Sequence, residues 1–290
     1  MIVDLSKYNT VTDWKKVKSA VDGVIIRCGY RGYGSGRIVA DAKAAEFAQQ
    51  CKANGIPFGV YFMSQAITTL EGTQEADYAC DFADKYGATL PVFIDSEDGD
   101  GTAKVVRADG LSKQLRTSIM QAFCNRVQER SRQAGIYASE SWFTGKLNYD
   151  AIKQYLIWVA KYGANNGSKC SVVNLSKFDG HQYTSNGTVP GIAGRVDLSE
   201  FYVLLKVVEQ TVEQEVSTEK ESEVHYNMKT IKKGSTGKTV KVWQIIVGAT
   251  PDGKFGSGTE SKTKNWQKSH GLVPDGIVGT KSWKVGLESL

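Results

Sequence analysis

Two carboxylates stand two residues apart at the end of an apolar run, in the sequence LPVFIDSE at residues 90–97. The run predicts a buried strand, and on a strand the side chains of Asp95 and Glu97 leave from the same face. If this strand belongs to a parallel α/β barrel, its C-terminal end lies where such enzymes build their active sites. A close pair of carboxylates at that place indicates glycoside hydrolysis.

The acidic run continues through Asp98 and Asp100, so a solvated acidic loop is the alternative interpretation. The preceding apolar strand favours a functional role for Asp95 and Glu97 only. A calcium loop is a further alternative, but the segment DSEDGDG lacks the ligand spacing and the final Glu of an EF-hand. We therefore expect neither a metal ion nor another cofactor.

Strand and helix signals alternate before this pair and after it, as they do in βα units. Helices are predicted at 39–54, 71–86 and 112–133, each ending before a glycine, the usual residue at a helix C-terminus. Eight strands with about five helices predict an irregular TIM-like (β/α)5(β)3 barrel. The predicted strands are 2–5, 23–28, 57–62, 90–94, 135–138, 156–160, 177–184 and 194–197.

Length and composition fit a compact barrel followed by a small module. The chain has 290 residues, of which 41% are hydrophobic, and no stretch approaches the roughly 18 to 20 apolar residues of a membrane span. The opening MIVDLSKYN does not have the pattern of a signal peptide, so we expect synthesis in a cytoplasm and no membrane partner. The five cysteines lack CxxC or His-paired spacing, which predicts buried free thiols.

Charge is unevenly distributed along the chain. Residues 1–206 carry a net charge of +3, residues 207–228 carry −5, and residues 229–290 carry +7. The middle segment has too little apolar content for a core and is predicted to be a solvated linker, although Leu205, Val208, Val212 and Val216 recur at helical spacing. The positive charge of the last segment comes from Lys alone, without a nucleic-acid-reading motif, so we expect no nucleic-acid partner.

The last segment contains an internal repeat with a period of 23 residues. Trp243-Gln244 recurs as Trp266-Gln267, Pro251-Asp252-Gly253 as Pro274-Asp275-Gly276, Gly256 as Gly279, and Thr259 as Ser282. Each unit predicts a helix that carries Trp-Gln, followed by a turn in which Asp accepts backbone N–H bonds and Gly takes a positive φ. The tryptophans are expected to hold a small helical bundle together.

This doubled DGxxG arrangement resembles the helical peptidoglycan-binding domain of wall hydrolases over about residues 229–286. The resemblance implies a noncatalytic module at 229–290 that anchors a catalytic domain on bacterial peptidoglycan. Linkage of this kind raises the local concentration of the catalytic domain at the wall.

Residues 1–206 resemble the glycoside hydrolase family 25 lysozymes, in motif order from one end to the other. One departure is His181, where the family often has Trp, which puts a stacking contact in doubt. The segments that carry the resemblance are Val3-Asp4-Leu5-Ser6 with Tyr8, Asp13-Trp14, Val24-Ile25-Ile26-Arg27, Gly59-Val60-Tyr61-Phe62, Asp95-Ser96-Glu97, Gly135-Ile136-Tyr137, Trp158-Val159-Ala160, Gln182-Tyr183-Thr184-Ser185 and Val196-Asp197-Leu198.

The resemblance implies an N-acetylmuramidase that cuts the β-1,4 bond from N-acetylmuramic acid to N-acetylglucosamine. Glu97 would be the general acid, a role that requires a pKa raised above the ordinary carboxyl range. Asp95 would orient the substrate's own acetamido group for attack on the anomeric carbon. Asp4 and Asp197, each expected to follow a short strand, would lie at the same end of the barrel.

Five further residues match family positions and are candidates for substrate contact. For the aromatic ones, packing inside the barrel is nearly as good an interpretation. The five are Arg27, Tyr61, Tyr137, Trp158 and Gln182.

The layout resembles a bacteriophage endolysin, made in the host cytoplasm and acting on the bacterial cell wall. The alternatives are an exported bacterial autolysin, a chitin-cleaving enzyme, and a noncatalytic wall-binding protein on an inactive barrel. Met228 stands at the boundary of the binding module, and a translation restart there would yield a free module able to associate with the full chain. Chance placement of one methionine is the alternative explanation.

Overall fold

The structure is a computed structural model that describes residues 1–97, 106–203, 205 and 230–288. By its contacts the chain divides into two compact units, Met1–Val212 and Glu213–Leu290. Each unit has a hydrophobic core of its own. Val208, Val212, Val216 and Met228, which carried the helix and restart hypotheses, lie outside the described residues.

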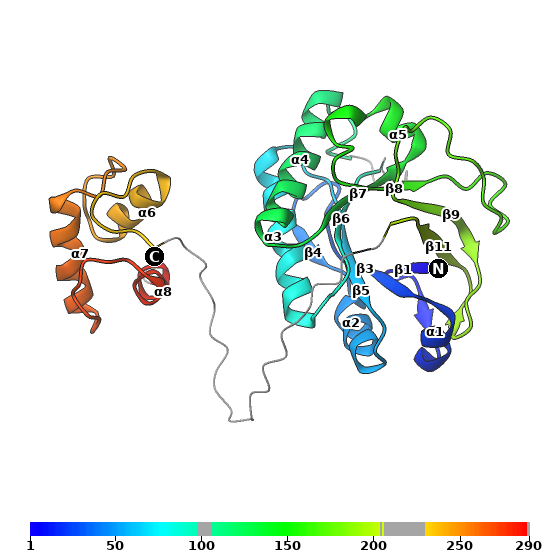
Figure 1. Cartoon of the computed structure of the whole chain (residues 1–290), viewed down its shortest axis with the longest axis horizontal. Coiled ribbons are helices and arrows are strands. Elements are labelled where there is room, and N and C mark those ends of the chain that lie inside the picture. The colour runs from blue at the N-terminus through cyan, green and yellow to red at the C-terminus, as the bar shows by residue number, and fades with distance from the viewer. Residues whose placement is uncertain (98–105, 204, 206–229, 289–290) are drawn as a thin grey trace. The chain divides into compact units, whose positions relative to one another are not determined.

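Eight strands of the first unit close into a barrel (Figure 1). Neighbouring strands are parallel except at β11, which runs antiparallel to both of its neighbours, β9 and β1. The predicted α/β barrel is thus confirmed. Each predicted strand is present, with the predicted bounds at 2–5 and 156–160 and with shifted bounds at the other six. Around the barrel the strands are β1 (Ile2–Leu5), β11 (Val196–Phe201), β9 (Gly180–Gly187), β8 (Leu156–Ala160), β7 (Ala134–Ser139), β6 (Val92–Asp95), β5 (Phe58–Met63) and β3 (Gly23–Arg31), which pairs with β1.

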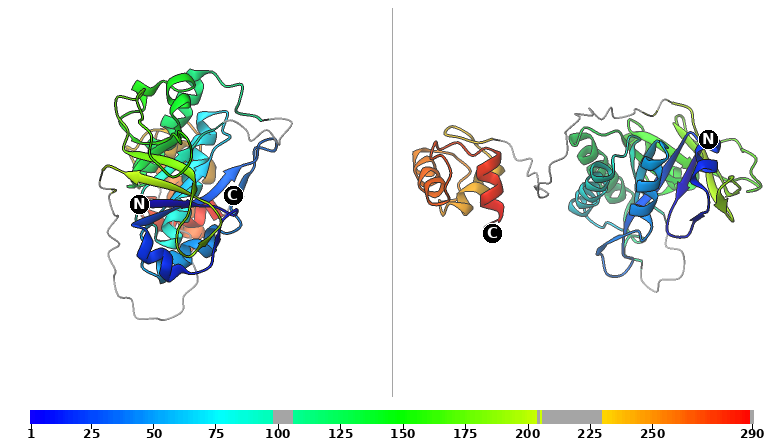
Figure 2. Two further views of the ribbon diagram at one scale, coloured as in Figure 1. Left: turned by 90° about the vertical axis from the view of Figure 1, so that its right-hand side faces the viewer. Right: turned by 90° about the horizontal axis from the view of Figure 1, so that it is seen from below.

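The helices of this unit lie outside the strands (Figures 1 and 2). α1 and α5 had no predicted range, because segments of seven and six residues are too short to show a helical period. Asp13 and Ser139 are N-cap residues of the types preferred at helix starts, and their side chains accept hydrogen bonds from backbone N–H groups of the first turn. The helices are α1 (Trp14–Ala20), α2 (Ala44–Ala53), α3 (Thr69–Tyr86), α4 (Lys113–Glu129) and α5 (Glu140–Gly145), with a 3-10 turn at Tyr149–Ala151.

Two helix predictions were wrong at one end. The helix expected over 39–54 begins only at Ala44, because Ile38–Ala40 forms β4 on the edge of β3 and Asp41 then holds a turn by accepting from Lys43 N (3.0 Å). The helix expected to reach 133 ends at Glu129, and Ser131 takes the left-handed conformation there with φ 57°. Two short strands, β2 (Thr10–Val11) and β10 (Ile192–Ala193), were not predicted.

The barrel interior is filled mainly by aromatic side chains. Trp158 is fully buried and makes edge-on contacts with Phe93 (ring centroids 5.1 Å apart) and Tyr137 (4.7 Å). Gly135 leaves room for this packing, because a Cβ there would lie 2.3 Å from the Phe93 ring. This glycine lies within β7, as the predicted strand at 135–138 requires.

His181 points to the other side of β9 from Gln182, since side chains alternate along a strand. It is buried and its Nε2 lies 2.7 Å from the Lys161 carbonyl oxygen. This histidine is therefore part of the packing around the barrel. All five cysteines are free, and all except Cys170 are buried, as predicted.

The second unit consists of α6 (Lys238–Ile246), α7 (Ser257–Ser269) and α8 (Thr280–Glu288). Trp243 is fully buried and makes edge-on contacts with Trp266 (4.9 Å) and Trp283 (5.1 Å). The expected tryptophan-centred helical bundle is therefore confirmed.

We predict that Gly135→Ala destabilises the first unit by about 1–3 kcal/mol, because the new methyl group overlaps the Phe93 ring. Gly145→Ala is the matched control, since a Cβ there meets nothing within 4 Å. Urea unfolding of both variants measures the difference. Equal stability of the two would show that the barrel interior is not packed in this way.

Candidate active site

Asp4 and Asp197 face each other across the closing strands of the barrel. They are register partners in the antiparallel pair of β1 and β11, and a hydrogen bond joins their side chains. Asp4 lies within β1 and Asp197 lies near the start of β11, so neither follows its strand and this part of the prediction was wrong. Because β11 runs antiparallel, its start nevertheless lies at the C-terminal ends of the other strands.

Gln182 connects this pair to two tyrosines. Its Nε2 donates to Asp4 Oδ2 (2.9 Å), and its Oε1 accepts from the hydroxyls of Tyr137 (2.7 Å) and Tyr162 (2.6 Å). The Gln182 amide is therefore oriented by donors on one side and an acceptor on the other. Such a chain fixes the side chains of three elements in one arrangement.

Asp95 ends β6, and Glu97 follows two residues later at the mouth of the same pocket. Asp95 is 5% exposed, and among the described residues its Oδ1 has no hydrogen-bond partner. The pocket has a volume of about 210 Å³. It is lined by Asp4, Tyr61, Asp95, Glu97, Tyr137, Trp158, Tyr162, Gln182 and Asp197.

Burial and mutual repulsion disfavour the charged forms of these carboxyls. Removal from water, then the charges of Glu97 and Asp4, raise the pKa of Asp95 well above its ordinary value, while Arg27 opposes the rise. Burial and the Asp197 charge likewise raise the pKa of Asp4 well above the ordinary value, and burial raises the pKa of Asp197. The pocket can therefore hold a protonated carboxyl beside ionised ones, the condition that acid catalysis needs.

Eight of the nine predicted site residues line this pocket, and Arg27 does not. The Arg27 guanidinium pairs with Asp41 (2.7 Å) and lies near the rings of Tyr8 and Tyr30. Tyr162 lines the pocket and was missed. Its position two residues after the apolar strand 156–160, in a Lys-Tyr-Gly segment, was the available signal.

The repeat of the second unit produces two equivalent side-chain arrangements. Gln244 Nε2 donates to Asp252 Oδ1 (2.8 Å) and its Oε1 accepts from Gly253 N (2.9 Å). Gln267 does the same with Asp275 (3.0 Å) and Gly276 N (2.9 Å). Both glycines have φ near 76°, as the turn prediction requires.

A pocket lies over each of these glutamines, at positions 23 residues apart. The first, of about 270 Å³, includes Ala249, Thr250 and Lys254, and the second, of about 310 Å³, has Leu272, Val273 and Ile277 at the same places. Val273 is 75% exposed. The two pockets therefore share a scaffold but differ in lining, and the second presents apolar surface to solvent.

No group of three or more His, Cys, Asp or Glu suited to a metal ion occurs among the described residues. Of the helices within the described ranges, none is long and apolar enough to span a membrane.

The barrel and its carboxylate-lined pocket place the chain among the glycoside hydrolases. Residues 3–192 match the model of Glycosyl hydrolases family 25, so the chain belongs to this family. Residues 243–285 match the model described as "Putative peptidoglycan binding domain".

Similar proteins include a lysozyme, an autolysin and an endolysin. The chain is similar to lysozyme M1 of Streptomyces globisporus, 29% identical over 209 residues that cover 69% of this chain and 66% of that protein. The autolysin LytC of Streptococcus pneumoniae, solved with a synthetic peptidoglycan ligand, is 28% identical with a TM-score of 0.58, covering 68% of this chain and 45% of that one. The catalytic domain of endolysin ply40 from Listeria monocytogenes bacteriophage P40 is 25% identical with a TM-score of 0.56, covering 68% and 90%.

We predict that Asp4→Asn stabilises the protein at pH 7 by on the order of 1 kcal/mol. The Asn amide can still accept from Gln182 and donate to Asp197, while one of the crowded charges is removed. The folded protein binds the carboxyl protons of Asp4, Asp95 and Asp197 more tightly than the unfolded chain does. The unfolding free energy of the wild type therefore falls as pH rises above the ordinary carboxyl pKa range. Calorimetry of the full chain at about pH 5 to 8 should show a weaker decline for the variant.

Glu46→Gln, at an exposed position on α2, is the control and should leave the pH dependence unchanged. An Asp4→Asn variant with wild-type stability and pH dependence would contradict the raised pKa of Asp4.

Proposed function

We propose that the protein is a peptidoglycan hydrolase that acts as an N-acetylmuramidase, cleaving the β-1,4 bond between N-acetylmuramic acid and N-acetylglucosamine. The observation that carries this proposal is Asp95 Oδ1, buried at the pocket without a donor among the described residues. An unsatisfied buried acceptor costs about 1–3 kcal/mol, so a ligand that brings a donor gains by meeting it. The acetamido N–H of an N-acetyl sugar is such a donor.

In this mechanism Glu97 is the general acid and Asp95 positions the acetamido group. As the bond from the anomeric carbon to the leaving oxygen breaks, the Glu97 proton moves to that oxygen and the acetamido oxygen bonds to the anomeric carbon. Water then opens the new ring, and Glu97 takes the proton from this water. The product retains configuration, and the usual relation between carboxyl separation and stereochemistry does not apply to such substrate-assisted reactions.

The other predicted residues have supporting roles in this proposal. Asp4 holds the Gln182 amide, and together with Asp197 it keeps negative charge near the reacting carbon. The sugar would contact Tyr61, Tyr137 and Trp158, which line the pocket together with Gln182. Arg27 would act through charge, because its guanidinium opposes the rise in the pKa of Asp95.

We predict that Glu97→Gln lowers release of soluble fragments from purified peptidoglycan by at least about 10²-fold, because the leaving oxygen loses its proton donor. Borohydride reduction of the wild-type fragments, followed by mass spectrometry, should identify reduced muramic acid ends. Glu46→Gln, an exposed glutamate on α2, is the matched control and should retain full activity.

Other products would decide between the alternatives. Reduced glucosamine ends would make the protein a glucosaminidase, and release from chitin would favour the chitin-cleaving alternative. No release by the wild type, with wall binding intact, would favour a noncatalytic wall-binding protein.

We also propose a modular layout, with a catalytic barrel at 1–206, an acidic linker at 207–228 and a peptidoglycan-binding domain of the doubled DGxxG type at 229–290. The family match over 243–285 and the equivalent contacts of Gln244 and Gln267 support the last part. The apolar pocket at Val273 is the part of this domain suited to the alkyl groups of a peptidoglycan stem peptide.

We predict that Val273→Asp lowers the amount of full-length protein that sediments with purified peptidoglycan by about tenfold. A charge there would have to lose water when apolar groups of the ligand pack against it. Thr250→Asp, at the equivalent position of the first pocket, should leave binding unchanged. Loss in Thr250→Asp with none in Val273→Asp would place the binding surface in the other repeat.

The biological setting we propose is a phage endolysin made in the host cytoplasm, with a bacterial autolysin as the alternative. The relatives include one protein of each kind, an autolysin and a phage endolysin. Expression inside the host distinguishes the two, because an endolysin lyses the cell only after the membrane is permeabilised. Self-association through the linker or binding domain remains a hypothesis that rests on Met228, and the intact mass of the purified product tests it by showing or excluding a fragment that starts there.

A further inference from the structure

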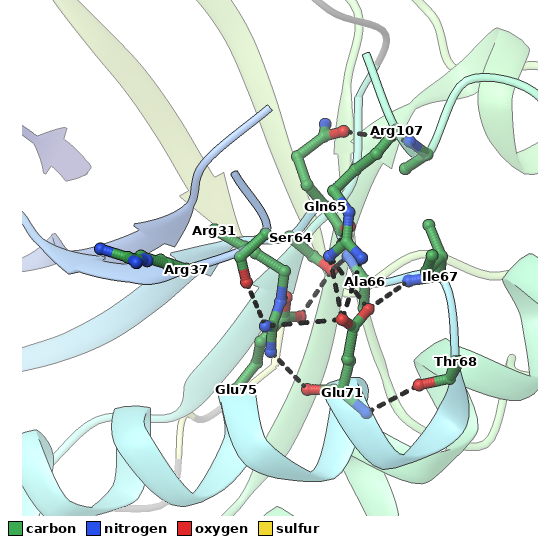
Figure 3. Close-up of polar contacts among 12 residues, drawn as sticks. Arg31, Arg37, Ser64, Gln65, Ala66, Ile67, Thr68, Glu71, Glu75 and Arg107 are labelled. Carbon is green, nitrogen blue, oxygen red and sulfur yellow. Dashed lines mark hydrogen bonds and ion pairs between the residues drawn. The ribbon is translucent and has the colours of Figure 1, made fainter. Parts of the chain in front are cut away.

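Helix α3 presents two glutamates four residues apart, Glu71 and Glu75, on one face of its N-terminal half. Each meets an arginine from another element, Arg107 and Arg31 respectively (Figure 3). All four side chains are at most 20% exposed. None of them lines the active-site pocket.

Glu75 lies directly behind the end of the strand that carries Asp95. Its Oε1 accepts from Arg31 Nε (2.6 Å) and its Oε2 accepts from Ser64 Oγ (2.6 Å). Ser64 follows β5, and its backbone N donates to the carbonyl oxygen of Asp95 (2.8 Å). Two hydrogen bonds therefore connect Glu75 to the backbone of the site.

Glu71 pairs with Arg107, which precedes α4. Arg107 NH1 donates to both Glu71 oxygens (3.0 and 3.1 Å), and its NH2 donates to Oε1 (3.0 Å). Arg107 NH1 also donates to the Gln65 carbonyl oxygen (3.3 Å), and Ala108 N donates to Gln65 Oε1 (3.3 Å). Glu71, Arg107 and Ala108 thus hold Gln65, the residue that follows Ser64.

Arg31 links the two halves of this cluster. Its NH2 donates to the Glu71 carbonyl oxygen (3.1 Å), and its NH1 lies 3.8 Å from Glu71 Oε1. Its NH1 also donates to the carbonyl oxygen of Gly36 in the β3–β4 hairpin (2.7 Å). Charged hydrogen bonds of this kind are strong and directional in a water-poor setting, so they hold backbone segments in fixed positions.

We propose that Glu71, Glu75, Arg31 and Arg107 form a clamp that holds Ser64 and Gln65 against the end of β6 and thereby sets the position of Asp95 and of Glu97 two residues later. The inference rests on the proposed function, in which these two carboxyls act on one glycosidic bond. The clamp residues are positioning residues, since they touch neither the pocket nor a substrate within it.

The test compares full-length Arg107→Gln, Glu71→Gln and the double variant on purified peptidoglycan, at a temperature where each is folded. We expect kcat to fall about ten- to hundredfold, because displacement of a reacting group by about 1 Å has effects of this size. KM should stay within about twofold of the wild-type value, because the pocket itself is intact. The double variant should be no worse than the poorer single variant, since the two residues act as one unit.

Two further variants separate positioning from folding. The kcat of Arg107→Lys should lie between those of Arg107→Gln and the wild type, because lysine keeps the positive charge but cannot make the bidentate contact with Glu71. Arg37→Gln is the matched control, since its exposed side chain lies in the same hairpin and points away from the cluster (Figure 3). It should retain wild-type kcat.

Wild-type kcat in a folded Arg107→Gln or Arg107→Lys variant would overturn the clamp, as would a raised KM with unchanged kcat. If Arg107→Gln does not fold, the Arg107→Lys result decides. A wild-type enzyme without activity in the same assay would contradict the proposed function and not the clamp alone.

Discussion

Antiparallel pairing of β11 with β1 is the constraint on which the site depends. In a wholly parallel barrel, a residue near the start of a strand lies at the end opposite the active site. Because β11 runs the other way, Asp197 faces Asp4 at the C-terminal ends of the other strands. Asp4 of this pair accepts a hydrogen bond from the Gln182 amide, and Gln182 in turn accepts from the hydroxyls of two tyrosines that line the pocket.

The same closure concentrates acidic groups where water is scarce. Asp4, Asp95 and Asp197 all have raised pKa values, with burial as the largest cause. Such crowding opposes folding at neutral pH, because the unfolded chain gives up these carboxyl protons more readily than the folded protein does. Other buried acids are neutralised by arginines that do not line the pocket. Asp41 pairs with Arg27, Glu71 with Arg107 and Glu75 with Arg31.

Much of the fold could be predicted because each barrel strand is a short apolar run. The apolar run before Asp95 and Glu97 predicted a strand with two carboxylates at its end, and both carboxylates line the pocket at the end of β6. The 23-residue repeat likewise predicted the glycine turns, since Asp-Gly has a local conformational preference that needs no tertiary contact.

The errors have a common cause, which is that tertiary pairing decided the local structure. Ile38–Ala40 resembles the start of a helix in sequence but adds to the edge of β3. The direction of β11 depends on partners at the opposite end of the unit, so the strand of Asp197 could not be oriented from its own residues. The pairing of Arg27 with Asp41 likewise depends on tertiary structure and could not be predicted from the sequence.

The most direct test of the account is a crystal structure of Glu97→Gln with a glycan of alternating N-acetylglucosamine and N-acetylmuramic acid. We predict a sugar in the pocket whose acetamido N–H donates to Asp95 Oδ1, with the glycosidic oxygen beside residue 97. A glycan bound in this pocket with its acetamido group directed away from Asp95 would contradict it.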